Sequence, residues 1–193
     1  MANEIDMLRA ALRDRVGGAA RKSAGARDAA VAAVLRSAGD DAEVLLIRRA
    51  ERHGDPWSGH IAFPGGKVEP GDQHLRRTAV RETYEEVGLD LAHHEYLGFL
   101  DDVSATARGA LTGMVVSPHV FTLSGPVGFM PNADEVAEVF WVSLNAMRRG
   151  ELDAHKRLQR DGQELVFPAF EVGPHLVWGL THRMLRELIA LAR

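Results

Sequence analysis

The spacing of apolar and polar residues predicts a β-hairpin early in the chain. Apolar residues dominate Ala29–Leu35 and Glu43–Arg48, two runs of strand length. The segment Ser37–Asp41 between them contains a glycine and two aspartates, residue types that favour a tight turn. We therefore expect the two runs to pair as neighbouring antiparallel strands.

Further strands are expected wherever short apolar runs are bounded by glycine, proline and polar residues. These runs are Ile61–Phe63, Tyr96–Val103, Gly113–Leu123, Val136–Leu144 and Glu164–Glu171. Pro118 interrupts one of them. Because proline has no backbone N–H to donate, it predicts a sheet edge or a bulge at that point.

Helical spacing of apolar residues occurs near both ends of the chain and in its middle. Glu4–Arg15 and Leu176–Leu191 each carry apolar residues on one helical face, and Leu144–Arg149 has the length of one helical turn. A further helix contains Arg81–Glu86 and is expected to end at Gly88, a typical helix C-cap.

Alternating strands and helices predict an α/β fold with a mixed sheet between helical layers. The polar, glycine-bearing segment Gly17–Arg27 is typical of a linker. We therefore divide the chain into an N-terminal helix with its linker, residues 1–27, and one larger domain, residues 28–193.

The composition is that of an ordinary globular protein. Hydrophobic residues make up 46% and charged residues 26% of the 193 residues, with a net charge of −4. The acidic balance argues against nucleic acids and anionic membranes as partners, and no apolar run approaches a membrane span. The absence of cysteine excludes disulfides and thiolate metal sites and fits a cytoplasmic protein. A homodimer is compatible with these features.

Three glutamates of the central helix predict a metal site. Glu82, Glu85 and Glu86 have the spacing that places side chains on one helical face. Their mutual repulsion is relieved if a cation lies between them, and hard oxygen ligands suit Mg²⁺ or Mn²⁺. The alternative is a solvated acidic face, but the Gly-Gly turn before the helix and the glycine after it favour a built site.

The stretch GGKVEPGDQHLRRTAVRETYEEVGL, residues 65–89, resembles the Nudix box of the Nudix hydrolase family. Gly66 matches the opening glycine, and the closing half is matched by Arg81, Glu82, Glu85, Glu86, Gly88 and Leu89. Thr83 stands where the pattern has an apolar residue. The interval between the halves is one residue longer than in the family pattern. Asp72 or Gln73 stands where the pattern has its first glutamate, and Asp72 could serve there as a helix N-cap.

This resemblance implies an α/β/α sandwich at residues 28–193 and hydrolysis of a nucleoside diphosphate linked to another group. It also implies that the carbonyl of Gly66 joins Glu82, Glu85 and Glu86 as metal ligands. Arg81 would orient one of these glutamates by a charge-assisted hydrogen bond rather than contact substrate.

The general base that would activate water is less strongly indicated by the sequence. One of the box glutamates is a candidate, and so is an acid from a later loop. Glu135, just before the strand at Val136, is the first choice, and Glu138 is the second. Both are equally compatible with plain exposed acids near a strand end.

A second motif, LLIRRAERHGDPWSGHIAFPGG at residues 45–66, resembles the segment that coenzyme A pyrophosphatases of this family carry before the box. Trp-Gly-Leu-Thr at residues 178–181 is also similar to that subfamily. The resemblance implies coenzyme A or acyl-CoA as substrate, with 3′,5′-ADP and a 4′-phosphopantetheine product. Arg49, Trp57 and Phe63 are the expected substrate contacts.

Two residues depart from the second motif. Asp55 stands where the motif has an arginine, and His60 where it has a glutamine. An acid in place of a cation is expected to weaken binding of the 3′-phosphate end of coenzyme A.

Other functions stay open at this level. ADP-ribose, a dinucleotide or an oxidised nucleotide could replace coenzyme A as the substrate. A non-catalytic nucleotide-binding module would be marked by loss of box glutamates, and all three are present here. RNA decapping would require basic surfaces, which the acidic balance does not favour.

Overall fold

The computed structural model describes residues 3–15, 28–107 and 110–192. The linker expected at Gly17–Arg27 therefore lies outside the described residues. The hairpin predicted from the first two apolar runs is confirmed. β1 (Asp28–Ala38) and β2 (Asp41–Arg49) pair antiparallel, and Gly39 in their turn has a φ of +67° that suits glycine.

A mixed sheet of eight strands is built around β1 within the described residues. Its order is β3–β2–β1–β7–β5, with β4 paired to β1, β6 to β7 and β8 to β2. β1 and β7 are parallel, and the other pairs are antiparallel. The remaining strands are β3 (Ile61–Ala62), β4 (Gly65–Lys67), β5 (Glu95–Phe99), β6 (Val103–Ala107), β7 (Ala110–Thr122) and β8 (Val136–Ser143).

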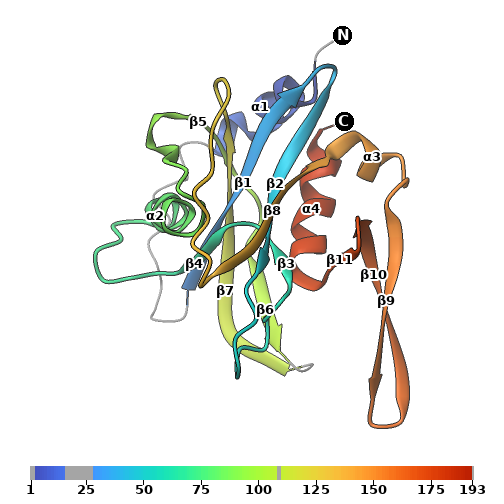
Figure 1. Cartoon of the computed structure of the whole chain (residues 1–193). Coiled ribbons are helices and arrows are strands. Elements are labelled where there is room, and N and C mark those ends of the chain that lie inside the picture. Colours follow the sequence, from blue (N-terminus) through green and yellow to red (C-terminus); the bar gives the residue numbers. More distant parts are fainter. Residues whose placement is uncertain (1–2, 16–27, 108–109, 193) are drawn as a thin grey trace.

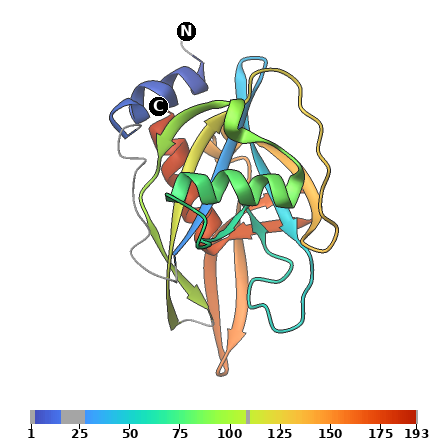
Figure 2. The same ribbon diagram turned by 90° about the vertical axis from the view of Figure 1, so that its left-hand side faces the viewer.

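Helices cover both faces of this sheet, with α2 on the left and α4 on the right in Figure 1. Neighbouring residues of β1 point to opposite faces, so Val34 packs in the cluster beneath α2 and Leu35 in the cluster beneath the other helices. Figure 2 shows α2 lying across the front of the sheet. The helices are α1 (Glu4–Leu12), α2 (Leu75–Val87), α3 (Leu144–Arg148) and α4 (Gly179–Leu191), with short 3₁₀ turns at Arg13–Arg15 and Leu91–His93.

These two layers confirm the predicted α/β/α sandwich. α1 contributes Ile5, Leu8 and Leu12 to the same buried cluster as α4, so it packs on the body of the protein. No helix of the described residues is long and apolar enough to cross a membrane.

Pro118 lies in an interior strand, not at an edge. Its carbonyl accepts a hydrogen bond from the Leu100 N–H at 2.9 Å, on the side of β7 that faces β5 and β6. A strand residue points its N and C=O to the same side, so the proline nitrogen faces the break between those two strands. The single strand expected over Tyr96–Val103 is interrupted at this break, and the missing donor therefore leaves no ladder bond unmade.

A second sheet of three antiparallel strands follows α3. It has the order β11–β10–β9 and consists of β9 (Asp153–Arg160), β10 (Gln163–Val172) and β11 (His175–Trp178). β9 is almost wholly polar, which is why no strand was expected there. The helix expected from Leu176 begins only at Gly179, because the residues before it pair with β10. β9 and β10 project from the body as a long hairpin (Figure 1).

Candidate active site

A pocket of about 430 Å³ lies beside the start of β1 and the end of β2. Its walls come from the loop after β2, the β3–β4 segment, α2, the start of β8 and the junction of β11 with α4. The lining combines carboxylates with aromatic rings: Glu82, Glu86 and Glu135 on the one hand, and Trp57, Phe63 and Trp178 on the other. Such a pocket can hold a ligand with both charged and flat parts.

Helix α2 carries the box glutamates and is held by caps at both ends. His74 caps the N-terminus, since its Nδ1 accepts the Arg77 N–H at 3.0 Å. Gly88, with a φ of +71°, ends the helix and donates its N–H to the Tyr84 carbonyl at 2.9 Å. The N-cap considered for Asp72 is therefore made by His74.

The three glutamates are not equivalent. Glu82 and Glu86, one turn apart, line the pocket, whereas the side chain of Glu85 is 50% exposed and lies outside the lining. Glu85 is held through Arg81, whose Nη1 donates to Glu82 and to Glu85 at 2.9 Å each. The helix thus presents two carboxylates to the pocket and keeps the third at its rim.

Arg81 links these glutamates to the loop before α2. Its guanidinium donates to Asp72 at 2.9 Å from Nη2 and 3.2 Å from Nε, and Nη2 also donates to the Lys67 carbonyl at 3.0 Å. These bonds, those to Asp72 first, raise the pKa of Arg81. The orienting role that the resemblance implies for Arg81 is compatible with these contacts and stays a prediction.

Asp72 anchors this network from a buried position. Its side chain is 3% exposed and also accepts hydrogen bonds from Thr78 Oγ1 at 2.9 Å and from the Glu69 N–H at 3.0 Å. Burial by itself would raise the pKa of Asp72, but the bonds from Arg81, Glu69 and Thr78 hold it below its ordinary value. The altered loop therefore keeps a buried acid bound to Arg81.

Glu86 is the most deeply buried of the pocket carboxylates, with a side chain 3% exposed. Its Oε2 accepts the Gly65 N–H at 2.8 Å, and its Oε1 lies 4.0 Å from Arg49 Nη1. Burial raises the pKa of Glu86 to about 8, against the opposing effects of Gly65 and Arg49. Such a group holds a proton at neutral pH unless a cation replaces it.

The two glycines before the helix allow this close approach. A Cβ on Gly65, which has a φ of +149°, would lie 2.4 Å from the Ala30 carbonyl oxygen. A Cβ on Gly66 would lie 2.4 Å from the carboxylate of Glu82. Any larger residue at Gly66 would displace that carboxylate, so the bare backbone is part of the site.

The donor chemistry of the pocket fits a hard divalent cation. Burial raises the pKa of Glu82 and of Glu86, and the charges of a neighbouring box glutamate and of Glu135 raise it further. A cation near these groups would relieve their repulsion, and Mg²⁺ and Mn²⁺ prefer such oxygen ligands. Over residues 3–15, 28–107 and 110–192, no three acidic or histidine side chains converge on one point. The pocket therefore contains carboxylate oxygens suited to such a cation, but they are not arranged as a complete coordination sphere.

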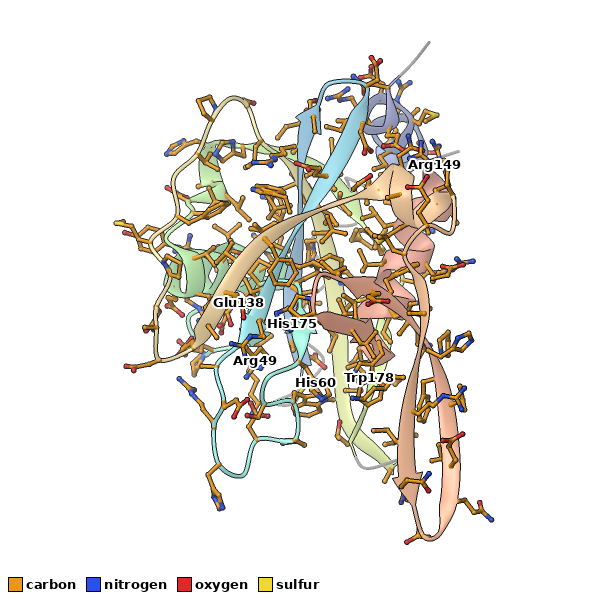
Figure 3. All side chains as sticks on the ribbon, turned by 45° about the vertical axis from the view of Figure 1, so that its right-hand side comes forward. Arg49, His60, Glu138, Arg149, His175 and Trp178 are labelled. Carbon is orange, nitrogen blue, oxygen red and sulfur yellow. The ribbon has the colours of Figure 1, made fainter. Side chains whose placement is uncertain are left out.

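The structure separates the two acids considered as the general base. Glu135 lies just before β8 and lines the pocket, and its Oε1 is 3.4 Å from Arg52 Nη2. Glu138 is instead paired with Arg48 at 2.6 Å and with His175 at 3.2 Å, and it is not part of the lining. Figure 3 shows Glu138 beside His175. Only Glu135 of the two faces the pocket.

Arg49 and Asp55 form an ion pair at the pocket wall. Arg49 Nη2 donates to Asp55 at 2.9 Å, and the Trp57 N–H donates to the other carboxylate oxygen at 2.9 Å. Burial opposes these bonds, which nevertheless hold the pKa of Asp55 below its ordinary value. Asp55 is therefore paired with a cation, and its expected effect on binding of the 3′-phosphate stays a prediction.

Aromatic residues complete the wall. Phe63 is 1% exposed and packs in the core while it touches the pocket, and Trp57 is partly buried. His60 lies 5.1 Å from Trp178 between ring centroids (Figure 3). Thr181 Oγ1 donates to the Ile61 carbonyl at 3.0 Å and joins α4 to β3.

The sequence reasoning did not assign His60 or Trp178 to the pocket. Both stand in stretches singled out for resemblance: His60 in the segment before the box, and Trp178 in Trp-Gly-Leu-Thr. The signal for a pocket wall was therefore present. The pairing that brings the two stretches together was not visible in the sequence.

Comparisons with known proteins agree with this geometry. A NUDIX domain model matches residues 26–161. The chain is 35% identical over 170 residues to human mitochondrial coenzyme A diphosphatase NUDT8, covering 86% of this chain and 69% of the relative. It is 33% identical over 149 residues to the uncharacterized Nudix hydrolase NudL of Yersinia pestis, covering 75% and 70%. A solved MutT/nudix family protein from Enterococcus faecalis shares the fold, with a TM-score of 0.54 at 20% identity over 86% of this chain and 62% of the other.

The family model covers well over half of the chain, and it includes the box glutamates of α2, Gly65 and Gly66, and Glu135, which precedes β8 and lines the pocket. The chain belongs to the Nudix hydrolase family and is a hydrolase of phosphoanhydride bonds.

Proposed function

We propose that this Nudix hydrolase is a divalent-metal-dependent diphosphatase of coenzyme A and acyl-CoA. Its products would be 3′,5′-ADP and 4′-phosphopantetheine or the acylated form. The observation that carries the proposal is a single pocket in which Glu82, Glu86 and Glu135 adjoin Arg49 and an aromatic wall. The name of the human relative, a coenzyme A diphosphatase, supports the substrate class.

Mg²⁺ or Mn²⁺ held by Glu82, Glu85, Glu86 and the Gly66 carbonyl would neutralise the diphosphate and lower the pKa of a bound water. Arg81 would keep two of these glutamates in place through its bonds to them. The half-exposed position of Glu85 suits a ligand at the rim of the site.

In the reaction, the oxygen of one water molecule bonds to one phosphorus of the diphosphate, and the bridging P–O bond breaks. Two phosphate monoesters result, and the protons of the water pass to a base and then to solvent. We assign the base to Glu135, because it faces the pocket while Glu138 is engaged outside it.

Arg49 would bind the diphosphate, and Asp55 would hold Arg49 in position. Asp55 fixes the guanidinium at 2.9 Å from one side, which lowers the entropy that Arg49 loses on binding an anion. This assignment is an alternative to the expectation that Asp55 repels the 3′-phosphate.

The test is a substrate panel with Mg²⁺ and with Mn²⁺, with products identified by mass. Coenzyme A, acetyl-CoA, ADP-ribose and a diadenosine polyphosphate should be offered at equal concentration. Water labelled with ¹⁸O shows which phosphorus is attacked, since the label appears in one product only. We expect the highest kcat/KM for the coenzyme A compounds.

Two results would overturn the assignment. Rapid turnover of ADP-ribose or the dinucleotide without cleavage of coenzyme A would show that the protein is a hydrolase but that coenzyme A is not its substrate. Tight binding of a nucleotide without turnover of any compound would point to a non-catalytic module.

A further inference from the structure

The β9–β10 hairpin has two different faces. Cross-strand partners lie on the same face of a hairpin, so the register places Lys156 with Phe167 and Leu158 with Leu165. We call these four residues the inner face. The opposite face pairs Arg157 with Val166 and Gln159 with Glu164, so three of these four residues are polar. The inner face is apolar except for one cation, Lys156.

A series of ring contacts joins this inner face to the pocket. Phe167 lies 5.6 Å from Trp178 between ring centroids, and Trp178 lies 5.1 Å from His60. Trp178 and His60 both line the pocket, whereas Phe167 belongs to the hairpin. Figure 3 shows His60 and Trp178 next to each other beside the hairpin. The inner face therefore continues the aromatic wall of the pocket.

Lys156 is a cation without an ionic partner among the residues that the structure describes. It lies opposite Phe167, whose ring contacts Trp178 of the pocket wall. Burial lowers the pKa of His60, and the positive charges of Lys156 and Arg49 lower it further. Two positive charges therefore act on His60, that of Arg49 in the pocket lining and that of Lys156 on the hairpin.

We propose that Lys156 is a specificity residue that binds the 3′-phosphate of the substrate, while Trp178 and His60 contact its adenine. The proposal deepens the function given above and rests on it. Coenzyme A carries two separate anionic groups with a flat base beside them. The pocket wall offers the complementary order, with Arg49 near the carboxylates, a ring platform, and Lys156 beyond the platform.

The experiment compares Lys156→Gln with Arg157→Gln in the full-length enzyme. Arg157 is the next residue of the same strand, points to the opposite face and pairs with Glu164 at 2.7 Å, so it controls for loss of one positive charge from the hairpin. Each variant is assayed with coenzyme A and with dephospho-coenzyme A, which lacks only the 3′-phosphate.

We expect Lys156→Gln to lower kcat/KM for coenzyme A about tenfold through KM, as one partly solvated ion pair predicts. Dephospho-coenzyme A should be cleaved by this variant as by the wild type, and Arg157→Gln should leave both substrates unaffected. Calorimetry gives a readout without turnover. The wild type should prefer 3′,5′-ADP over AMP, and Lys156→Gln should lose that preference.

Each other outcome is decisive. If Lys156→Gln alters both substrates equally, or neither, the 3′-phosphate is bound elsewhere and the proposed function still stands. If Arg157→Gln has the same selective effect, the hairpin acts only through its net charge, and the assignment to Lys156 fails. If the wild type cleaves neither compound, the proposed function fails and this inference with it.

Discussion

The exchange Asp72→Asn tests whether the altered box loop is a buried anchor or a helix cap. Asp72 accepts four hydrogen bonds: two from Arg81, one from Thr78 and one from the Glu69 N–H. Asparagine keeps one acceptor oxygen and puts an NH₂ group where the other was, so donor would face donor. A cap at the helix terminus would cost only about 1 kcal/mol when replaced.

The expected loss of stability in Asp72→Asn depends on the hydrogen bonds that Arg81 retains in the variant. Removing one member of a buried ion pair costs about 3–5 kcal/mol when the remaining charge has no other partner. Arg81 is 16% exposed and retains its bonds to Glu82 and Glu85. We therefore expect Asp72→Asn to lower the free energy of unfolding by about 2–3 kcal/mol at pH 7.

Equilibrium unfolding in urea measures this difference, with Glu69→Gln as the matched control. Glu69 is 64% exposed and lies 3.9 Å from Arg81 Nη1, so its loss should cost less than about 0.5 kcal/mol. Equal stability of Asp72→Asn and the wild type would refute the reasoning, and so would an equal cost for the two variants.

The pH dependence has a defined sign. The pKa of Asp72 is lowered in the folded state, so its stabilising effect is present above the unfolded value of about 3.9. It is lost as the pH falls through the lower folded value. The stability gap between wild type and Asp72→Asn should therefore stay constant from pH 8 to pH 5 and close only in stronger acid.

Three further exchanges address the pocket. Glu86→Gln should abolish most turnover. In the metal-free protein it should raise the free energy of unfolding above that of the wild type, and this gain should be larger at pH 8 than at pH 5. The pKa of Glu86 is raised to about 8, so its contribution to stability is full below the unfolded value of about 4.3 and is lost as the pH rises through 8. Glu135→Gln should lower kcat about a hundredfold, whereas Glu138→Gln should have no effect. Gly66→Ala should displace Glu82 and weaken Mn²⁺ binding measured by calorimetry, because its Cβ would lie 2.4 Å from that carboxylate.

Each of these has a contradicting result. Thermal unfolding in EDTA that shows no gain for Glu86→Gln would mean that the side chain is not a buried charge. Equal rates for Glu135→Gln and Glu138→Gln would show that Glu135 is not the base. Unchanged Mn²⁺ affinity in Gly66→Ala would show that Glu82 is free to move aside.

The helix with its glutamates could be predicted from the sequence because every signal for it is local. The glutamate spacing and Gly88 are read within one segment, and the structure places the helix end at Gly88. The burial of Glu86 against Gly65 could not be foreseen, because it depends on how closely α2 approaches the β3–β4 segment. The spacing of the glutamates alone does not show that Glu86 is buried and Glu85 is exposed.

The missed elements share a physical cause. Leu158 is the one large apolar residue of β9, so the strand character of β9 comes from pairing with β10 and not from an apolar pattern. Leu176–Trp178 fits the helical spacing of the residues after it, yet the bonds offered by β10 draw these residues into a strand. The loop acids Asp55 and Asp72 were expected to act on a ligand and on a helix end. Both are paired with arginines six and nine residues away in the chain, and spacing alone does not show which way these loop side chains point.

The pairing of β8 with β2 has a consequence for how the protein folds. Leu45 in β2 lies opposite Trp141 in β8, so this edge of the early hairpin stays open until a distant part of the chain arrives. An open edge next to buried apolar residues invites association with other chains. Glu135 directly precedes β8, and the Ala50 N–H donates to its carbonyl at 2.7 Å. The step that closes the vulnerable edge therefore also delivers the acid to the pocket, so recovery of activity during refolding should keep pace with protection from aggregation.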